Sequence, residues 1–254
     1  MPKLDRDGVK IHYEIHGSGP TLLLSHGYSS TARMWDGQVA ALKDRYQVIV
    51  WDMRGHGESD YPTDPKLYSE ALTVGDMKAL LDLAGAGKAI VAGLSLGGYM
   101  SLAFNASHPE RVRALMLFDT GPGFKRDEAR AKWNETAHQR AATFDAKGLA
   151  ALNSSDEVAL TRHRDATGLA GAARGMLAQQ NDRVIQSLDK VAAPTLVLVG
   201  ANDTNFLAAT DYMAAKIKGA TKVIIPDAGH ASNLHQPARF NQAVEAFLAK
   251  MPAV

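Results

Sequence analysis

The sequence predicts an α/β protein built on a mostly parallel sheet with helices on both faces. Strand-like segments alternate with helical segments along most of the 254 residues, an order typical of parallel sheets. Several of the strands are apolar throughout, as expected for strands that are buried on both faces. A glycine-rich turn around Ser95 joins one such strand to a helix. The length fits one large domain, or a core that carries a small insertion.

Alternation and apolar runs identify the first strands. Apolar and polar residues alternate from Val9 to Ile15, which predicts a half-exposed strand. A turn over residues 17–20 follows, and we expect the apolar strand from Thr21 to Ser25 to be its partner. The next predicted elements are a short helix from Trp35 to Leu42 and a strand from Gln47 to Trp51.

The middle of the chain continues the same order. An apolar stripe predicts a helix from Glu70 to about Leu83. The strand before Ser95 covers Ala89 to Ala92, and a helix follows from Gly97 to about Asn105. A further apolar strand is expected from Val112 to Phe118.

A break in the alternation predicts a helical cap over residues 123–188, inserted between core segments 1–122 and 189–254. This stretch is charged and rich in alanine, with helical patterns over 126–144, 156–164 and 169–180. Alternation then resumes with four expected elements: a strand from Thr195 to Val199, a helix from Leu207 to Ile217, a strand from Lys222 to Ile225 and a helix from Pro237 to Ala249.

Composition argues against several function classes. A net charge of +1 argues against attraction to nucleic acid or to an anionic membrane. The absence of cysteine excludes disulfides, thiolate catalysis and cysteine-bound metals. No apolar stretch approaches the roughly 20 residues of a spanning helix, and the polar N-terminus does not resemble a signal peptide. We expect a cytoplasmic protein that uses no metal or other cofactor. A homo-oligomer stays possible at this point.

The residues around Ser95 form the motif Gly93-x-Ser95-x-Gly97. In this pattern a serine occupies a strained strand-to-helix turn that exposes its hydroxyl above the sheet. Glycine is needed on either side because the chain doubles back there and side chains would collide. The helix that follows directs its positive end toward the hydroxyl. Ser95 is therefore the predicted nucleophile.

A serine nucleophile needs a base, and the base needs a carboxylate that orients it. His230 and Asp203 each follow a predicted strand, at the sheet edge where ligands bind. The order Ser95, Asp203, His230 matches that of hydrolases whose nucleophile lies on such a strand-to-helix turn, which is called the nucleophile elbow. Asp119, which also follows a strand, is the alternative acid. His235 is the alternative base, although we expect it to cap a helix or to face solvent.

An oxyanion site needs two backbone donors. One is predicted to be the N–H of Leu96, directly after the nucleophile, and the other comes from an earlier post-strand loop. That loop contains Tyr28, whose N–H is the candidate, and His26, which we expect to brace the loop by hydrogen bonds. The polar turn over residues 52–59 is interpreted as structural.

These segments together resemble the α/β-hydrolase superfamily over nearly the whole chain. The matching segments are His26-Gly27-Tyr28, residues 52–59, residues 93–98, Gly200-x-x-Asp203 and Gly229-His230. Within the superfamily, residues 54–59 and 228–237 are similar to the group of 3-oxoadipate enol-lactonases, small esterases and cofactor-free haloperoxidases. The resemblance implies an eight-stranded sheet with a helical cap over the site. A serine at position 95 argues against the epoxide hydrolase and dehalogenase branches.

The resulting hypothesis is a serine esterase that acts on small-molecule carboxylic esters through an acyl-serine intermediate. Phe124, Trp133 and Phe206, together with Tyr28, are candidates to line an apolar substrate pocket. The first alternative is a lactonase of the enol-lactonase type, which would hold a substrate carboxylate with cations such as Arg33, Arg126 or Arg130. A carbon–carbon bond hydrolase and a non-catalytic ligand receptor on the same fold are the remaining alternatives.

Overall fold

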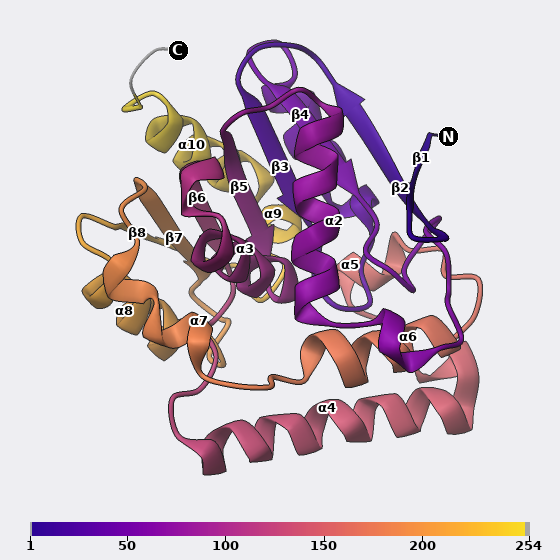
Figure 1. Ribbon diagram of the computed structural model, residues 1–254. Coiled ribbons are helices and arrows are strands. Elements are labelled where there is room, and N and C mark those ends of the chain that lie inside the picture. The colour runs from indigo at the N-terminus through magenta and orange to yellow at the C-terminus, as the bar shows by residue number, and fades with distance from the viewer. Residues whose placement is uncertain (1, 252–254) are drawn as a thin grey trace.

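A single eight-stranded sheet organises the protein, which we describe from a computed structural model of residues 2–251. The strand order is β1-β2-β4-β3-β5-β6-β7-β8 (Figure 1). All neighbours from β4 to β8 pair in parallel, whereas β2 runs antiparallel to both β1 and β4. The predicted α/β class and the mostly parallel sheet are confirmed.

The strands are β1 (Lys3–Arg6), β2 (Val9–His16), β3 (Thr21–Ser25), β4 (Gln47–Trp51), β5 (Ala89–Leu94), β6 (Val112–Phe118), β7 (Thr195–Gly200) and β8 (Thr221–Ile225). The core helices are α1 (Asp36–Leu42), α2 (Glu70–Leu83), α3 (Leu96–Ser107), α8 (Leu207–Lys216), α9 (Ser232–His235) and α10 (Pro237–Leu248). Between β6 and β7 lie α4 (Asp127–Lys147), α5 (Asp156–Ala159), α6 (Thr167–Ala172) and α7 (Arg183–Gln186).

Three expectations about these elements were wrong or incomplete. β3 does not pair with β2, because it lies between β4 and β5 and β2 pairs with β4 instead. The helix expected over 156–164 ends at Ala159, and beyond it His163 and Arg164 bond to core residues, among them Ser29 and Tyr61. The helix expected over 169–180 is α6 followed by a π-helical turn that ends at Leu177. The pattern of apolar and polar residues in the sequence also did not predict β1, α7 or α9.

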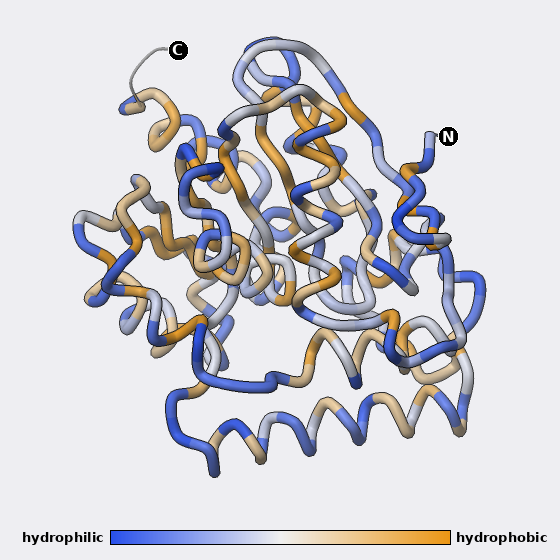
Figure 2. Tube along the Cα trace, in the orientation of Figure 1, coloured by the Kyte–Doolittle hydropathy of each residue, from blue (hydrophilic) through white to orange (hydrophobic). Residues whose placement is uncertain are grey.

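Two apolar layers hold helices to the sheet. On one face, α2, α3 and α8 pack on one set of strand residues, among them Leu23, Val91 and Leu115. On the other face, α1 and α10 pack on the alternate residues, among them Leu24, Ile90 and Met116. Figure 2 shows the central strands as the most hydrophobic segments and α4 as mostly hydrophilic. No helix within residues 2–251 is long and apolar enough to span a membrane.

Residues 123–188 lie across one end of the sheet, where α4 runs as a long helix below the core in Figure 1. They have a small apolar cluster of their own, which includes Ala141, Phe144 and Leu169, and Tyr28 of the core packs against it. The Tyr28 hydroxyl also donates to the Leu169 carbonyl at 2.8 Å. A loop of the core thus extends into the helical segment.

The turn over residues 52–59 has the structural role expected from the sequence. The buried Arg54 guanidinium contacts both carboxylate oxygens of Asp76 on α2, at 2.7 and 2.9 Å. Asp52 accepts hydrogen bonds from the N–H groups of Ala32 and Glu58, at 2.7 and 2.9 Å. These contacts fix the turn against the loop that follows β3.

Candidate active site

Ser95 occupies a tight turn between β5 and α3. Its φ of 55° and ψ of −117° lie in a region that side-chain-bearing residues rarely adopt. A Cβ on Gly93 would lie 2.3 Å from the Gly97 carbonyl carbon, and one on Gly97 would lie 2.1 Å from the Ser25 oxygen. Only glycine permits these approaches. The predicted strained elbow is therefore present, with Ser95 at its tip.

His230 and Asp203 meet beside this elbow. His230 Nδ1 lies 2.7 Å from Asp203 Oδ2. The Asp203 side chain is buried, and the Phe206 ring stacks on the imidazole at 5.2 Å between centroids. Ser95, Asp203 and His230 all line one cavity. Among the described residues no hydrogen bond joins Ser95 to His230, a contact that often tightens only when substrate is bound.

The surroundings of His230 favour its protonated form. Burial lowers the pKa of the imidazole, but the hydrogen bond and charge of Asp203 outweigh it and raise the pKa above 6.5. Asp119 and Glu157 add smaller contributions in the same direction. In the neutral ring, Asp203 accepts from Nδ1–H, which leaves the lone pair on Nε2 for a proton. This is the electronic arrangement of a general base held by a carboxylate.

Asp119, the alternative acid, is directed elsewhere. Its carboxylate accepts hydrogen bonds from the Gly200 N–H at 2.8 Å and from the Ser232 hydroxyl. Burial raises the pKa of Asp119 to about 7, although both hydrogen bonds oppose the rise. Asp119 thus ties β7 to α9 and contacts neither ring nitrogen of His230.

His235, the alternative base, supports the loop that carries His230. Its Nδ1 accepts from the Gly229 N–H at 2.8 Å, and its Nε2 lies 3.1 Å from Asp156 Oδ2. The expectation that it only caps a helix or faces solvent was therefore incomplete. His235 holds the peptide that precedes His230.

The loop after β3 presents the Tyr28 amide beside Ser95. A Cβ on Gly27 would lie 3.4 Å from the Ser95 Cβ, so the loop backbone packs on the nucleophile. The Gly27 carbonyl accepts from His26 Nδ1 at 2.7 Å and from the Ser30 N–H at 3.1 Å. Because a trans peptide is planar, fixing this carbonyl directs the Tyr28 N–H the opposite way. The bracing role expected for His26 is thus visible in its contacts.

Neither candidate oxyanion donor is used inside the protein. In residues 2–251, the N–H groups of Tyr28 and Leu96 donate to no protein acceptor. Leu96 is the first residue of α3, where N–H groups have no partner within the helix. Both residues line the cavity that contains Ser95. Two unpaired backbone donors therefore border the candidate nucleophile.

Two histidines hold the residue after Tyr28. Ser29 adopts a φ of 58°, at a turn position where glycine is favoured. Its N–H donates to His56 Nε2 at 3.2 Å, and its carbonyl accepts from His163 Nε2 at 3.1 Å. Burial lowers the pKa of both histidines, so both imidazole rings are uncharged near pH 7. Since His163 belongs to residues 123–188, the helical segment helps to set the shape of this loop.

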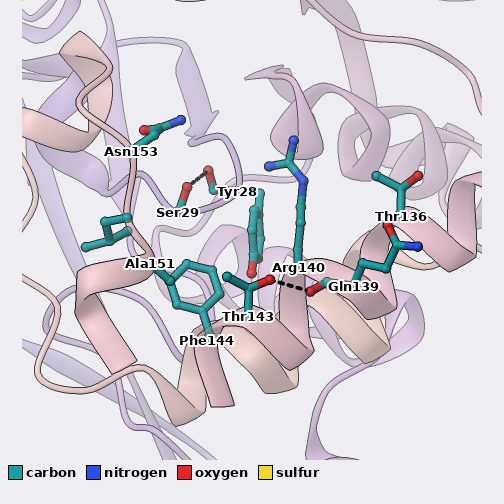
Figure 3. Close-up of a pocket in the computed structure, with 10 residues that line it drawn as sticks. Tyr28, Ser29, Thr136, Gln139, Arg140, Thr143, Phe144, Ala151 and Asn153 are labelled. Atoms are coloured by element: carbon teal, nitrogen blue, oxygen red, sulfur yellow. Dashed lines mark hydrogen bonds between the residues drawn. The ribbon is translucent and has the colours of Figure 1, made fainter. Parts of the chain in front are cut away.

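The cavity has a volume of about 690 Å³ and extends from the elbow to α4. The aromatic candidates Phe124, Trp133 and Phe206 all lie on its wall. Phe124 and Trp133 pack together at 5.8 Å between ring centroids. A side chamber of about 380 Å³ shares several wall residues with it, including Tyr28 and Arg140. Figure 3 shows Tyr28 and Arg140 among the side chains that line this chamber.

Arg140 and Gln179 also line the cavity, although neither was predicted from the sequence. None of the arginines considered earlier does so: Arg33 pairs with Glu14 and Asp36, Arg130 pairs with Asp127, and Arg126 lies outside the cavity wall. Helical spacing could have identified Arg140, because Trp133, Thr136 and Arg140 share one face of α4 and all face the cavity. Within residues 2–251 no histidine and carboxylate cluster could hold a metal ion.

Comparison with known proteins identifies relatives along the whole chain. The model of a family described as "Alpha/beta hydrolase family" matches residues 22–243. 3-oxoadipate enol-lactonase 2 of Acinetobacter baylyi is 29% identical, and the match covers 97% of this chain and 96% of the relative.

Solved structures agree with this match. A hydrolase from Pseudomonas aeruginosa is 30% identical with a TM-score of 0.82, and the match covers 97% of each chain. A thermophilic esterase from Thermogutta terrifontis is 26% identical with a TM-score of 0.84, and the match covers 99% of each chain.

The contacts of His230 predict how its pKa responds to substitution. Asp203→Asn removes the charge that outweighs burial, so we expect the pKa of His230 to fall below 6.5. NMR titration of the imidazole measures this directly. Asp119→Asn is the matched control and is expected to lower the pKa less, since Asp119 does not contact the ring. A larger shift from Asp119→Asn than from Asp203→Asn would reverse the assignment of the acid.

Proposed function

The chain belongs to the alpha/beta hydrolase family, and we propose that it is a serine hydrolase that cleaves small carboxylic esters through an acyl-serine intermediate. The observation that carries the proposal is the Asp203–His230 hydrogen bond of 2.7 Å beside a serine held in a strained elbow. The esterase and enol-lactonase names among the similar proteins support the same reaction class.

In the proposed first half-reaction, Ser95 Oγ attacks the ester carbonyl carbon while His230 Nε2 takes the hydroxyl proton. The carbonyl oxygen becomes an oxyanion, which the N–H groups of Tyr28 and Leu96 stabilise. The tetrahedral intermediate then collapses, the bond to the alcohol oxygen breaks, and His230 returns its proton to that oxygen. The products are a free alcohol and an ester of Ser95.

In the proposed second half-reaction, His230 takes a proton from a water molecule that attacks the acyl carbon. Collapse of this intermediate breaks the bond between the acyl carbon and Ser95 Oγ. Ser95 regains its proton from His230, and the carboxylic acid is released. Asp203 keeps the proton of the neutral ring on Nδ1 and stabilises the imidazolium in both halves. Each of the two backbone donors is worth roughly 10²–10³ in rate.

Residues 123–188 are proposed to act as a cap that closes the substrate cavity. Phe124 and Trp133 would contact the apolar part of the ester, with Phe206 beside the base. Because His163 of the cap bonds to the Ser29 carbonyl, the position of the cap and the shape of the Tyr28 loop are linked. We propose that substrate size is limited by the distance between the elbow and α4.

Hydrolysis of p-nitrophenyl acetate, butyrate and octanoate tests the proposal. Ser95→Ala is expected to lower kcat by about 10⁶ if the three residues act as a unit. A rate maximum at one chain length would measure the size of the cavity. A Ser95→Ala variant that keeps a tenth of the wild-type turnover contradicts the assignment. Binding of esters with no turnover would favour a non-catalytic receptor.

Arg140 favours a second candidate function, hydrolysis of lactones or esters that carry a carboxylate. Arg140 lines both the main cavity and the side chamber. It has no carboxylate partner within the described residues, so a substrate anion could pair with it. Glu157 also lines the main cavity and contributes to the potential at His230. The substrate carboxylate would therefore lie toward Arg140 and away from the base.

We expect Arg140→Gln to reduce kcat/KM for mono-p-nitrophenyl glutarate by about 10-fold, the loss of one charge-assisted hydrogen bond. The uncharged p-nitrophenyl valerate should change much less. Arg126→Gln, an exposed position outside the cavity, is the matched control. Equal losses on both esters would mean that Arg140 shapes the cavity without selecting anions.

A further inference from the structure

The carboxamide of Gln179 is an unpaired polar group in the wall of the catalytic cavity. The residue is 7% exposed, and its Oε1 atom is buried without a hydrogen-bond partner in the described residues. Gln179 lies on the cavity wall together with Tyr99 and Gly123. Buried acceptors are almost always paired in folded proteins, so an unpaired one at a binding cavity indicates a hydrogen bond that a ligand completes.

The backbone of Gln179 is fixed by one side chain of α4. Asn134 Nδ2 donates to the Gln179 carbonyl at 2.8 Å, and Asn134 Oδ1 accepts from the Gln179 N–H at 2.7 Å. The preceding residue of α4, Trp133, donates from Nε1 to the Leu177 carbonyl at 2.8 Å. Two consecutive residues of α4 thus hold the segment 177–179. The backbone of Gln179 therefore has a fixed place on the cavity wall.

A glycine makes room for the carboxamide oxygen. Gly123 has a φ of 89°, and a Cβ placed on it would lie 2.8 Å from Gln179 Oε1. The nearby Tyr99 hydroxyl donates to Glu70 Oε2 at 2.7 Å and is therefore committed elsewhere. The oxygen is thus packed against the Gly123 backbone and receives no hydrogen bond from the neighbouring tyrosine. A turn of the carboxamide about its side-chain torsions brings the oxygen to the cavity, where a substrate group can donate to it.

We propose that Gln179 is a substrate-binding residue that hydrogen-bonds a hydroxyl group of the ester, so that the preferred substrates are hydroxy esters. This inference rests on the proposed function and specifies its substrate class. A hydroxyl can donate to Oε1, whereas an alkyl chain leaves the acceptor unpaired and a carboxylate offers only further acceptors. A site built to bind a hydroxyl discriminates strongly against the analogue that lacks it.

The test compares kcat/KM for ester pairs that differ in one hydroxyl. Suitable pairs are ethyl 2- or 3-hydroxybutanoate against ethyl butanoate, and 2-hydroxyethyl butanoate against propyl butanoate. The wild-type protein is expected to prefer at least one hydroxylated member by about 10-fold or more, the effect of pairing a buried acceptor. Gln179→Met, which removes the acceptor at similar volume, is expected to bring that ratio close to one.

Two further variants make the comparison specific. Gln179→Glu keeps an acceptor oxygen and is expected to keep the preference for the hydroxylated ester. Gln186→Met is the matched control, because Gln186 lies on α7 outside the cavity wall. A wild-type ratio near one for every pair, or a preference that survives in Gln179→Met, overturns the proposal.

Binding measurements separate this proposal from the catalytic one. Calorimetric titration of Ser95→Ala with the same intact esters should give tighter binding of the preferred hydroxy ester, and this difference should disappear in Ser95→Ala/Gln179→Met. Absence of Ser95-dependent turnover would contradict the proposed hydrolase. The ratio of affinities for the hydroxylated and the unsubstituted ester would still test the role of Gln179. Equal affinities for all pairs would contradict the role of Gln179 alone.

Discussion

The backbone conformation of Ser95 is the constraint on which the candidate site depends. A residue with a φ of 55° and a ψ of −117° persists only where its surroundings allow no alternative. Those surroundings are the contacts of Gly93 with Gly97 and of Gly97 with the Ser25 carbonyl, together with the Ser95 N–H bond to Phe118 at 2.9 Å. The elbow thus joins β3, β5 and β6, and its strain is supported by the centre of the sheet.

The same sheet edge positions Asp203, His230 and the Tyr28 loop, but the insertion completes the arrangement. Asp203 and His230 follow β7 and β8, so strand packing alone brings them together. The Tyr28 loop is held from the core by His26 and His56 and from residues 123–188 by His163. Gln179 depends on Asn134 of α4 in a similar way. In the proposed function, the chemistry is therefore encoded mainly in the core, and substrate selection mainly in the helical segment.

The core could be predicted from sequence because its signals are local. The strand Val112–Phe118 and the helix Glu70–Leu83 have the predicted bounds, since an apolar run defines the first and Ser69 caps the second. Pairing of β2 could not be predicted, because alternation specifies which face is buried but not which strand lies beside it. The short α5 and the place of Gln179 depend on contacts between distant segments, which leave no periodic signal in the sequence. Arg140 is different, because its helical spacing from Trp133 and Thr136 places it on the same face of α4.

Covalent labelling of Ser95 tests the central claim most directly. A fluorophosphonate forms a stable phosphonyl ester with a serine only when a base activates it and the oxyanion donors are in place. Mass spectrometry of the intact and digested protein should then detect one adduct, located on the peptide that contains Ser95, and none in His230→Ala. An adduct at another residue, or an unmodified Ser95 in the wild-type protein, would contradict the account.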